Sequence, residues 1–208
     1  MSNYDIKTIV FDLGGVIFSS GTTLAIKKIS NNFGVDYRKV YSLFIDKTNR
    51  LGYKLRAGII TMDEFLETSV KKLGLKKSDK EHIKNIWFNS YLPHYGMIDL
   101  LKKLNNGYRL VVFSGNVKDR IEFLDKRYNF MKYFDDSVFS FDFHHNKKEI
   151  EFYEELLKHL NCEPKQAILI DDDKETINFA QSVGINTITF YYPEKLFEDL
   201  KAFNVKIN

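Results

Sequence analysis

The chain has 208 residues, of which 44% are hydrophobic and 15% aromatic, so it can bury a core of domain size and is not intrinsically disordered. Its 31 basic and 28 acidic residues leave a net charge of +3, which does not indicate a nucleic-acid-binding protein. The single cysteine, Cys162, excludes an internal disulfide and a cysteine-based zinc cluster. Neither a secretory signal nor an apolar run near the ~20 residues of a membrane span is present, so we expect a cytoplasmic protein without a membrane partner.

The first predicted element is a strand over residues 6–11, which are apolar and β-branched like a central parallel strand. Four helical patterns follow within residues 22–91, and no strand pattern interrupts them. The second pattern extends to Gly52, and the third opens with a capping box formed by Thr61 and Glu64. This region is therefore predicted to be entirely helical.

Strands and helices alternate in the rest of the chain. Helical segments separate the predicted strands, which cover residues 108–113, 137–141, 166–170 and 186–190. This order predicts an α/β fold with a mostly parallel, Rossmann-like sheet. The sheet core comprises residues 1–15 and 95–208, and the helical region, residues 16–94, is an insertion after the first strand.

Three of the predicted strands end on polar residues. Asp12 follows the first strand, Ser114 follows the second, and Asp171, Asp172 and Asp173 follow the fourth. The carboxyl ends of parallel strands lie at one edge of a sheet, where ligands bind, so these groups are expected to meet there. Crowded carboxylates repel unless a cation lies between them, and an all-oxygen ligand set favours Mg²⁺. The alternative is that each residue only caps the helix that follows it.

These segments resemble the four motifs of the haloacid dehalogenase-like hydrolases, and specifically the phosphatases with a helical cap after the first motif. The first motif is "VFDLGGV" with Asp12 at the nucleophile position, and the second is "LVVFSGN" with Ser114. The third is a lysine before a helix in "NKKEIEFYEELLKHL", where the aromatic Tyr153 selects Lys147 and a shift of one residue would select Lys148. The fourth is "ILIDDDKETINFAQSVGI" with its acidic run.

The resemblance implies a magnesium-dependent phosphatase acting on a small phosphorylated metabolite. Asp12 would attack phosphorus and form an aspartyl-phosphate, with Ser114 and Lys147 as the other catalytic residues. Mg²⁺ would be held by Asp12, the Gly14 carbonyl, Asp171 and Asp172. The substrate would contact Gly14, Gly15, Ser114, Gly115, Asn116, Lys147 and Arg56, although Arg56 is also compatible with a solvated side chain. The sequence carries no distinctive signal for an oligomeric state.

Gly14 departs from the family pattern, which usually has a second acid at this position. That acid protonates the leaving oxygen and later activates water, and such help is typically worth about 10²–10⁴ in rate. Gly14 keeps a backbone carbonyl for a metal but has no carboxyl. His94 and Asp46 are possible substitutes from the helical insertion. Gly115 is a second departure, since asparagine is common there.

Three functions are therefore compatible with the sequence. The first is a slow or selective phosphatase, and the second is a non-catalytic homologue that binds a phosphorylated ligand or a protein. The third is a metal-independent 2-haloacid dehalogenase, whose branch also lacks the second acid. The acids at Asp171 to Asp173 argue against the dehalogenase, because that chemistry has no use for a metal.

Overall fold

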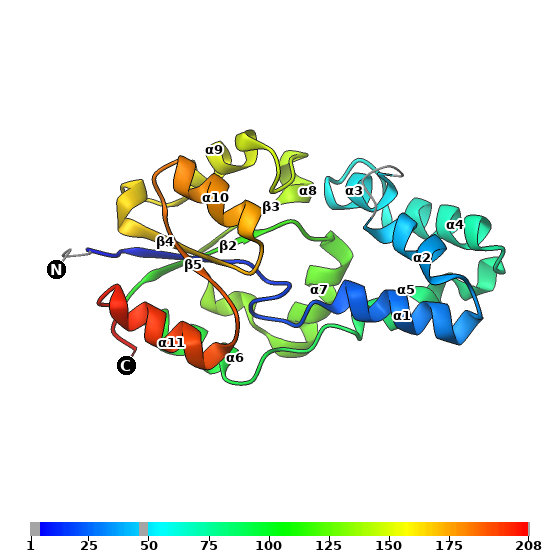
Figure 1. Ribbon diagram of the computed structural model, residues 1–208, viewed down its shortest axis with the longest axis horizontal. Coiled ribbons are helices and arrows are strands. Elements are labelled where there is room, and N and C mark those ends of the chain that lie inside the picture. Colours follow the sequence, from blue (N-terminus) through cyan, green and yellow to red (C-terminus); the bar gives the residue numbers. More distant parts are fainter. Residues whose placement is uncertain (1–4, 46–49, 208) are drawn as a thin grey trace.

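The computed structural model describes residues 5–45 and 50–207, which form a five-stranded parallel sheet with helices on both faces and a helical block at one end (Figure 1). The strand order is β3-β2-β1-β4-β5. The strands are β1 (Thr8–Phe11), β2 (Arg109–Ser114), β3 (Asp136–Phe139), β4 (Ala167–Asp171) and β5 (Asn186–Thr189). The α/β class and the parallel sheet predicted from the sequence are confirmed.

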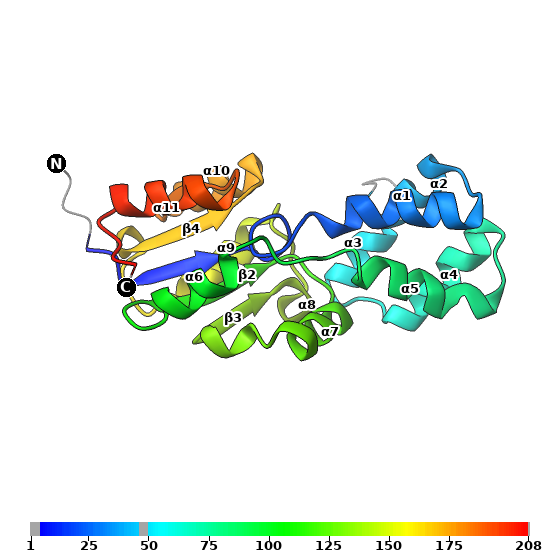
Figure 2. The same ribbon diagram turned by 90° about the horizontal axis from the view of Figure 1, so that it is seen from below.

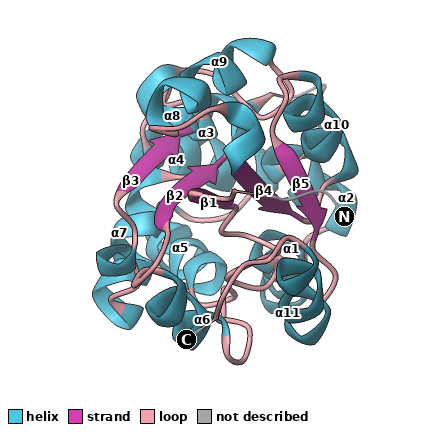
Figure 3. Ribbon diagram, turned by 90° about the vertical axis from the view of Figure 1, so that its left-hand side faces the viewer, coloured by secondary structure: helices cyan, strands magenta, loops and turns pink. Residues whose placement is uncertain are grey.

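Helices cover both faces of the sheet, and the alternating side chains of β1 explain why. Ile9 and Phe11 belong to one hydrophobic cluster, whereas Val10 belongs to the other. One face is covered by α9 (Ile150–His159) and α10 (Lys174–Ser182), as Figure 3 shows from the end of the sheet. The opposite face is covered by α6 (Met97–Leu104), α7 (Lys118–Tyr128) and α11 (Pro193–Ala202). The short helix α8 (Ser140–Phe143) follows β3, and single 3₁₀ turns occur at Lys77–Asp79, Met131–Tyr133 and Pro164–Gln166.

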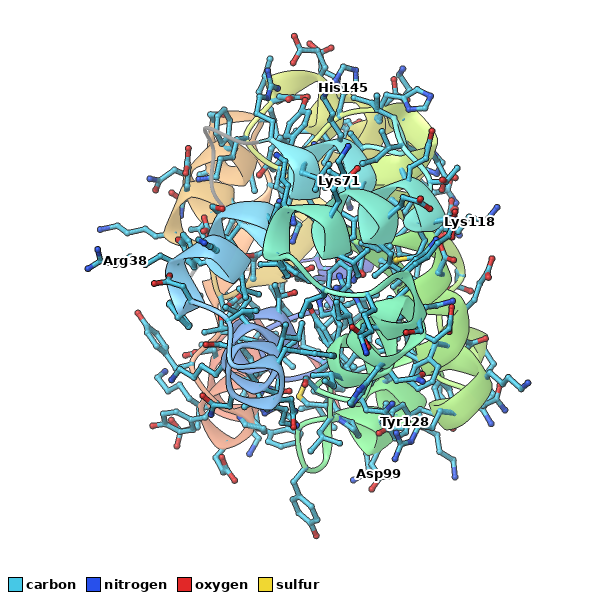
Figure 4. The ribbon with its side chains drawn as sticks, turned by 90° about the vertical axis from the view of Figure 1, so that its right-hand side faces the viewer. Arg38, Lys71, Asp99, Lys118, Tyr128 and His145 are labelled. Atoms are coloured by element: carbon cyan, nitrogen blue, oxygen red, sulfur yellow. The ribbon has the colours of Figure 1, made fainter. Side chains whose placement is uncertain are left out.

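The helical block lies beyond the carboxyl ends of the strands in both side views (Figures 1 and 2). It consists of α1 (Gly21–Phe33), α2 (Tyr37–Phe44), α3 (Leu51–Arg56), α4 (Met62–Leu73) and α5 (Lys80–Phe88). Phe44, Phe65 and Trp87 form its aromatic core, with ring centroids 4.8–5.5 Å apart. Exposed basic residues such as Arg38 on α2 point away from it into solvent (Figure 4). No helix in the described ranges has the length and hydropathy of a membrane span.

The predicted end of the second helix is wrong. It was expected to continue to Gly52, but α2 ends at Phe44 and Gly52 lies inside the separate helix α3. A Cβ atom at Gly52 would overlap the Phe44 carbonyl oxygen, so the glycine permits close packing of two helices rather than ending one. The capping box at Thr61 and Glu64 is confirmed at the start of α4.

A tight loop joins β1 to the helical block and brings two glycines to the end of the sheet. The amide of Phe18 donates to the Leu13 carbonyl at 2.7 Å, and the amide of Gly15 donates to the Phe18 carbonyl at 2.6 Å. Gly15 has a φ of +101°, and a Cβ atom there would overlap the carboxylate of Asp172. Only glycine satisfies both conditions, so this loop and the end of β4 are packed against each other.

We expect Gly15→Ala to lower the free energy of unfolding by more than the strain of a positive φ would lower it alone. Positive-φ strain and steric overlap each cost about 1–3 kcal/mol. Gly34→Ala is the matched control, because Gly34 has a φ of +62° with no atom within 4 Å of its Cβ position. Urea unfolding of both variants measures the difference. Equal losses would show that Asp172 yields to the added methyl group without cost.

Candidate active site

Asp12 is the residue around which the polar groups at the end of the sheet gather. It directly follows β1 and is only 8% exposed. The Ser114 hydroxyl, at the end of β2, donates to Asp12 Oδ1 at 2.8 Å. The ammonium of Lys147 lies 2.8 Å from the same oxygen. The structure thus brings together Asp12, Ser114 and Lys147, which the sequence placed on three separate segments.

Lys147, rather than Lys148, is the lysine that reaches these carboxylates. Its Nζ atom also lies 2.6 Å from Asp171 Oδ2, whereas Lys148 pairs with Glu175 on α10. The Tyr153 hydroxyl donates to the Lys147 carbonyl at 2.9 Å and so fixes the position of the loop before α9. Burial lowers the pKa of Lys147, but the carboxylates of Asp12 and Asp171 outweigh it and hold the pKa above its usual range. Lys147 therefore remains a cation.

Asp171 and Asp172 form a carboxylate cluster with Asp12. One carboxylate oxygen from each of the three lies within 4.8 Å of the others. Burial raises the pKa of Asp171 to about 7, with Lys147 opposing the rise and Asp12 adding to it. Burial also raises the pKa of Asp172, and the charge of Asp12 contributes. Three oxygen ligands with unfavourable mutual repulsion suit a hard divalent cation such as Mg²⁺.

Asp173 has a different role from its two neighbours. Its side chain accepts hydrogen bonds from the amides of Glu175 at 2.8 Å and Thr176 at 3.0 Å, which makes it the N-cap of α10. The helix-capping alternative raised from the sequence thus applies to Asp173. Its backbone amide donates to Asp171 Oδ1 at 2.8 Å and helps to orient that carboxylate.

The second motif continues into a buried network around Asn116. Asn116 is 2% exposed, and its Oδ1 accepts from the Val117 amide at 2.8 Å. The same oxygen accepts from Arg120 Nε at 2.9 Å and Arg120 Nη2 at 2.5 Å. Its amide nitrogen lies 3.4 Å from Ser114 Oγ. Asn116 and Gly115 both line the adjacent cavity, but the Asn116 side chain is committed mainly to Arg120.

A cavity of about 810 Å³ opens between the sheet end and the helical block. Asp12, Gly14, Ser114 and Lys147 line it from the sheet side. Thr22, Ile45, Arg50, Tyr53 and Arg56 line it from the helical block. The volume falls within the ~300–1,000 Å³ typical of small-molecule sites and exceeds what a phosphate ion alone requires.

Tyr91 is a cavity residue that sequence reasoning missed. Its ring lies beside Gly14, with Cε1 3.4 Å from the position that a Cβ atom on Gly14 would take. Its hydroxyl is 2.5 Å from Thr22 Oγ1, which also accepts a hydrogen bond from Trp87 Nε1 at 3.0 Å. No local motif marks Tyr91, because its place depends on how α5 returns to the sheet.

The remaining predicted site residues have different surroundings. Arg56 is partly buried, lines the cavity and donates from Nη1 to the Phe44 carbonyl at 3.0 Å, so it is not a solvated side chain. His94 contacts the Gly15 backbone and packs on Phe190 at 5.7 Å between centroids. His94 is absent from the cavity lining in the described part of the chain, and its suggested role as a substitute acid stays a prediction. Asp46 lies outside the described residues.

Comparisons with known proteins agree with this architecture. The family model "haloacid dehalogenase-like hydrolase" matches residues 6–184. An uncharacterized protein of Dictyostelium discoideum is 33% identical over 95% of this chain and 97% of its own length. A phosphorylated carbohydrates phosphatase of Thermotoga maritima is 24% identical over 88% of this chain and 83% of its own length.

Solved structures share the fold across almost the whole chain. A HAD-like family hydrolase from Porphyromonas gingivalis has a TM-score of 0.78 at 18% identity, covering 97% of this chain and 99% of its own. A HAD family enzyme from Bacteroides thetaiotaomicron, in complex with magnesium and inorganic phosphate, has a TM-score of 0.73 at 24% identity, covering 90% and 95%. L-2-haloacid dehalogenase from Xanthobacter autotrophicus has a TM-score of 0.66 at 14% identity, covering 97% and 84%. The matched family model, which spans most of the sheet core and the whole helical block, shows that the chain belongs to the haloacid dehalogenase-like hydrolases.

Proposed function

We propose that the chain is a magnesium-dependent phosphatase that acts on a small phosphorylated metabolite. The observation that carries the proposal is the grouping of the Asp12, Asp171 and Asp172 carboxylates with the Lys147 ammonium, of which Asp12 and Lys147 line the cavity. The phosphatase relative from Thermotoga maritima and the magnesium and phosphate bound in the Bacteroides thetaiotaomicron enzyme support it.

Asp12 is the proposed nucleophile. A carboxylate oxygen of Asp12 attacks phosphorus, the bond from phosphorus to the leaving oxygen breaks, and an aspartyl-phosphate forms. Water then attacks the phosphorus of this acyl phosphate and returns the Asp12 carboxylate with inorganic phosphate. The Ser114 hydroxyl and the Lys147 ammonium, both 2.8 Å from Asp12 Oδ1, orient the nucleophile and balance charge on the phosphoryl oxygens.

Asp12, Asp171, Asp172 and the backbone carbonyl of Gly14 are the groups proposed to hold Mg²⁺. A bound Mg²⁺ would neutralise the repulsion between the carboxylates and an incoming phosphoryl group. In the absence of a carboxyl at position 14, the leaving oxygen needs another proton source. Tyr91, which lines the cavity with its ring beside Gly14, is the proposed donor, and Thr22 Oγ1 contacts its hydroxyl at 2.5 Å.

The two alternative functions differ from this one in what they require of the acidic cluster. A metal-independent dehalogenase has no use for three gathered carboxylates, so the cluster disfavours it. A non-catalytic binding protein would keep the cluster and bind phosphate without turnover. Hydrolysis of p-nitrophenyl phosphate, inhibited by EDTA and restored by magnesium, separates the phosphatase from both.

Asp12→Asn and Lys147→Gln are expected to reduce p-nitrophenyl phosphate hydrolysis by at least about 100-fold, because each removes a group in contact with the phosphoryl position. Lys148→Gln is the matched control, since its ammonium pairs with Glu175, and it should retain most of the activity. Steady-state kinetics measure all three variants. Full activity in Asp12→Asn would exclude the aspartyl-phosphate mechanism.

Asp172→Asn is expected to weaken magnesium binding strongly, and Asp173→Asn should leave it nearly unchanged. The first change removes a charge from the carboxylate cluster, whereas asparagine at position 173 can still cap α10. Isothermal titration with magnesium chloride measures both affinities. If the two variants lose affinity equally, the cluster is not the metal site.

Tyr91→Phe is expected to slow hydrolysis of alkyl phosphates by about 100-fold while slowing aryl phosphates much less, because a phenolate leaves without protonation. The wild-type protein should itself prefer aryl phosphates, since it lacks the second acid. Tyr53→Phe is the matched control, because Tyr53 also lines the cavity but donates to Glu149 at 2.6 Å. A uniform loss on both substrate classes would argue against proton donation by Tyr91.

A further inference from the structure

Two arginines line the cavity, and neither forms an ion pair with a described residue, although the charge of Asp12 helps to hold up the pKa of Arg120. Arg56 comes from α3 of the helical block, and Arg120 comes from α7 beside the sheet. No ion pair in residues 5–45 and 50–207 involves either guanidinium. The nearest acceptors are neutral: the Phe44 carbonyl for Arg56 and the Asn116 side chain for Arg120.

Arg120 is the more unusual of the two, because its charge is fully buried. The residue is 3% exposed, and its guanidinium lies over the rings of Tyr91 and Trp87, 4.3 and 5.0 Å from their centroids. Its Nη1 atom is buried without a hydrogen-bond partner in the part of the chain that the structure describes. Aromatic faces attract a cation but do not replace an anion, so this charge is incompletely compensated.

Burial disfavours the charged state of both arginines. It lowers the pKa of Arg56 to about 10, and the positive charge of Arg120 adds to the decrease. Burial also lowers the pKa of Arg120, with Tyr91 and Asp12 opposing the decrease. An anion between or beside the two groups would relieve both effects.

A charge count of the cavity lining shows a surplus of cations. The basic residues are Arg50, Arg56, Arg120, Lys147 and Lys148, and the acidic ones are Asp12 and Asp173. Lys147 is balanced by Asp12 and Asp171, and Lys148 by Glu175. The surplus in the described lining therefore lies with the arginines.

We propose that Arg56 and Arg120 form a subsite for a second anionic group, a carboxylate or a phosphate, carried by the leaving group of the substrate. Arg56, partly exposed to the cavity, makes the direct contact, and the buried charge of Arg120 strengthens it through the low-dielectric surroundings. The inference rests on the proposed phosphatase function. It narrows the substrate to phosphorylated acids and bisphosphates, and it disfavours phosphorylated neutral alcohols.

Binding of stable phosphonates tests this subsite without requiring turnover. Alkylphosphonates that carry a terminal carboxylate, across a series of short chain lengths, are compared by isothermal titration with the matching plain alkylphosphonates, in the presence of magnesium. A second series with a terminal phosphonate separates the carboxylate from the phosphate as the second anion. At the best chain length we expect roughly 10- to 100-fold tighter binding of the doubly anionic compound, as for an added charged hydrogen bond.

Arg56→Met should lower the affinity for the doubly anionic compounds far more than the affinity for plain alkylphosphonates, and so remove this preference. Arg38→Met is the control, because Arg38 is an exposed residue of α2 that points into solvent (Figure 4). Equal affinity of the two compound classes at every chain length, or an unchanged preference in Arg56→Met, would overturn the proposal. Hydrolysis of p-nitrophenyl phosphate by the wild-type protein is measured in parallel. No hydrolysis would refute the phosphatase function, whereas hydrolysis without any preference for a second anion would refute only the subsite.

Discussion

The proximity of three carboxylates at one end of the sheet is the constraint on which the rest of this structure depends. Asp12, Asp171 and Asp172 offer oxygens within 4.8 Å of one another, and burial raises the pKa of Asp171 and Asp172. Such an arrangement is unfavourable by itself, because burial and mutual repulsion both oppose ionisation. Lys147 offsets part of this cost by contacting Asp12 and Asp171 at once. The remaining imbalance is what a divalent cation and a phosphoryl group would be needed to resolve.

The two adjacent glycines after Asp12 lie beside different neighbours. Gly15 lets the chain pass close to the Asp172 carboxylate, which fixes one member of the acidic cluster. Gly14 lies beside the ring of Tyr91, but a Cβ atom there would make an ordinary van der Waals contact at 3.4 Å. Sterics therefore demand glycine at position 15 and do not account for the missing acid at position 14.

Much of the fold and the centre of the site could be predicted because their signals are local. Buried strands ending on Asp12, Ser114 and Asp171 needed only the rule that parallel strands share an edge. Tyr153 selected Lys147 from the sequence, but a shift of one residue left Lys148 as an alternative, and only the loop geometry separates the two. Gly52 was misinterpreted because a glycine that permits close helix packing and a glycine that ends a helix have the same sequence signal.

Tyr91 and Arg120 were out of reach for a related reason, because their roles arise between elements far apart in the chain. Tyr91 meets Gly14 and Thr22, and Arg120 meets the Tyr91 and Trp87 rings. The described cavity lining therefore combines Asp12 from the end of the sheet with arginines from α3 and α7. Under the proposed function, a ligand that meets both would carry a phosphoryl group and a second anionic group. Substrate selection would then depend on how the helical block is packed against the sheet as well as on the catalytic motifs.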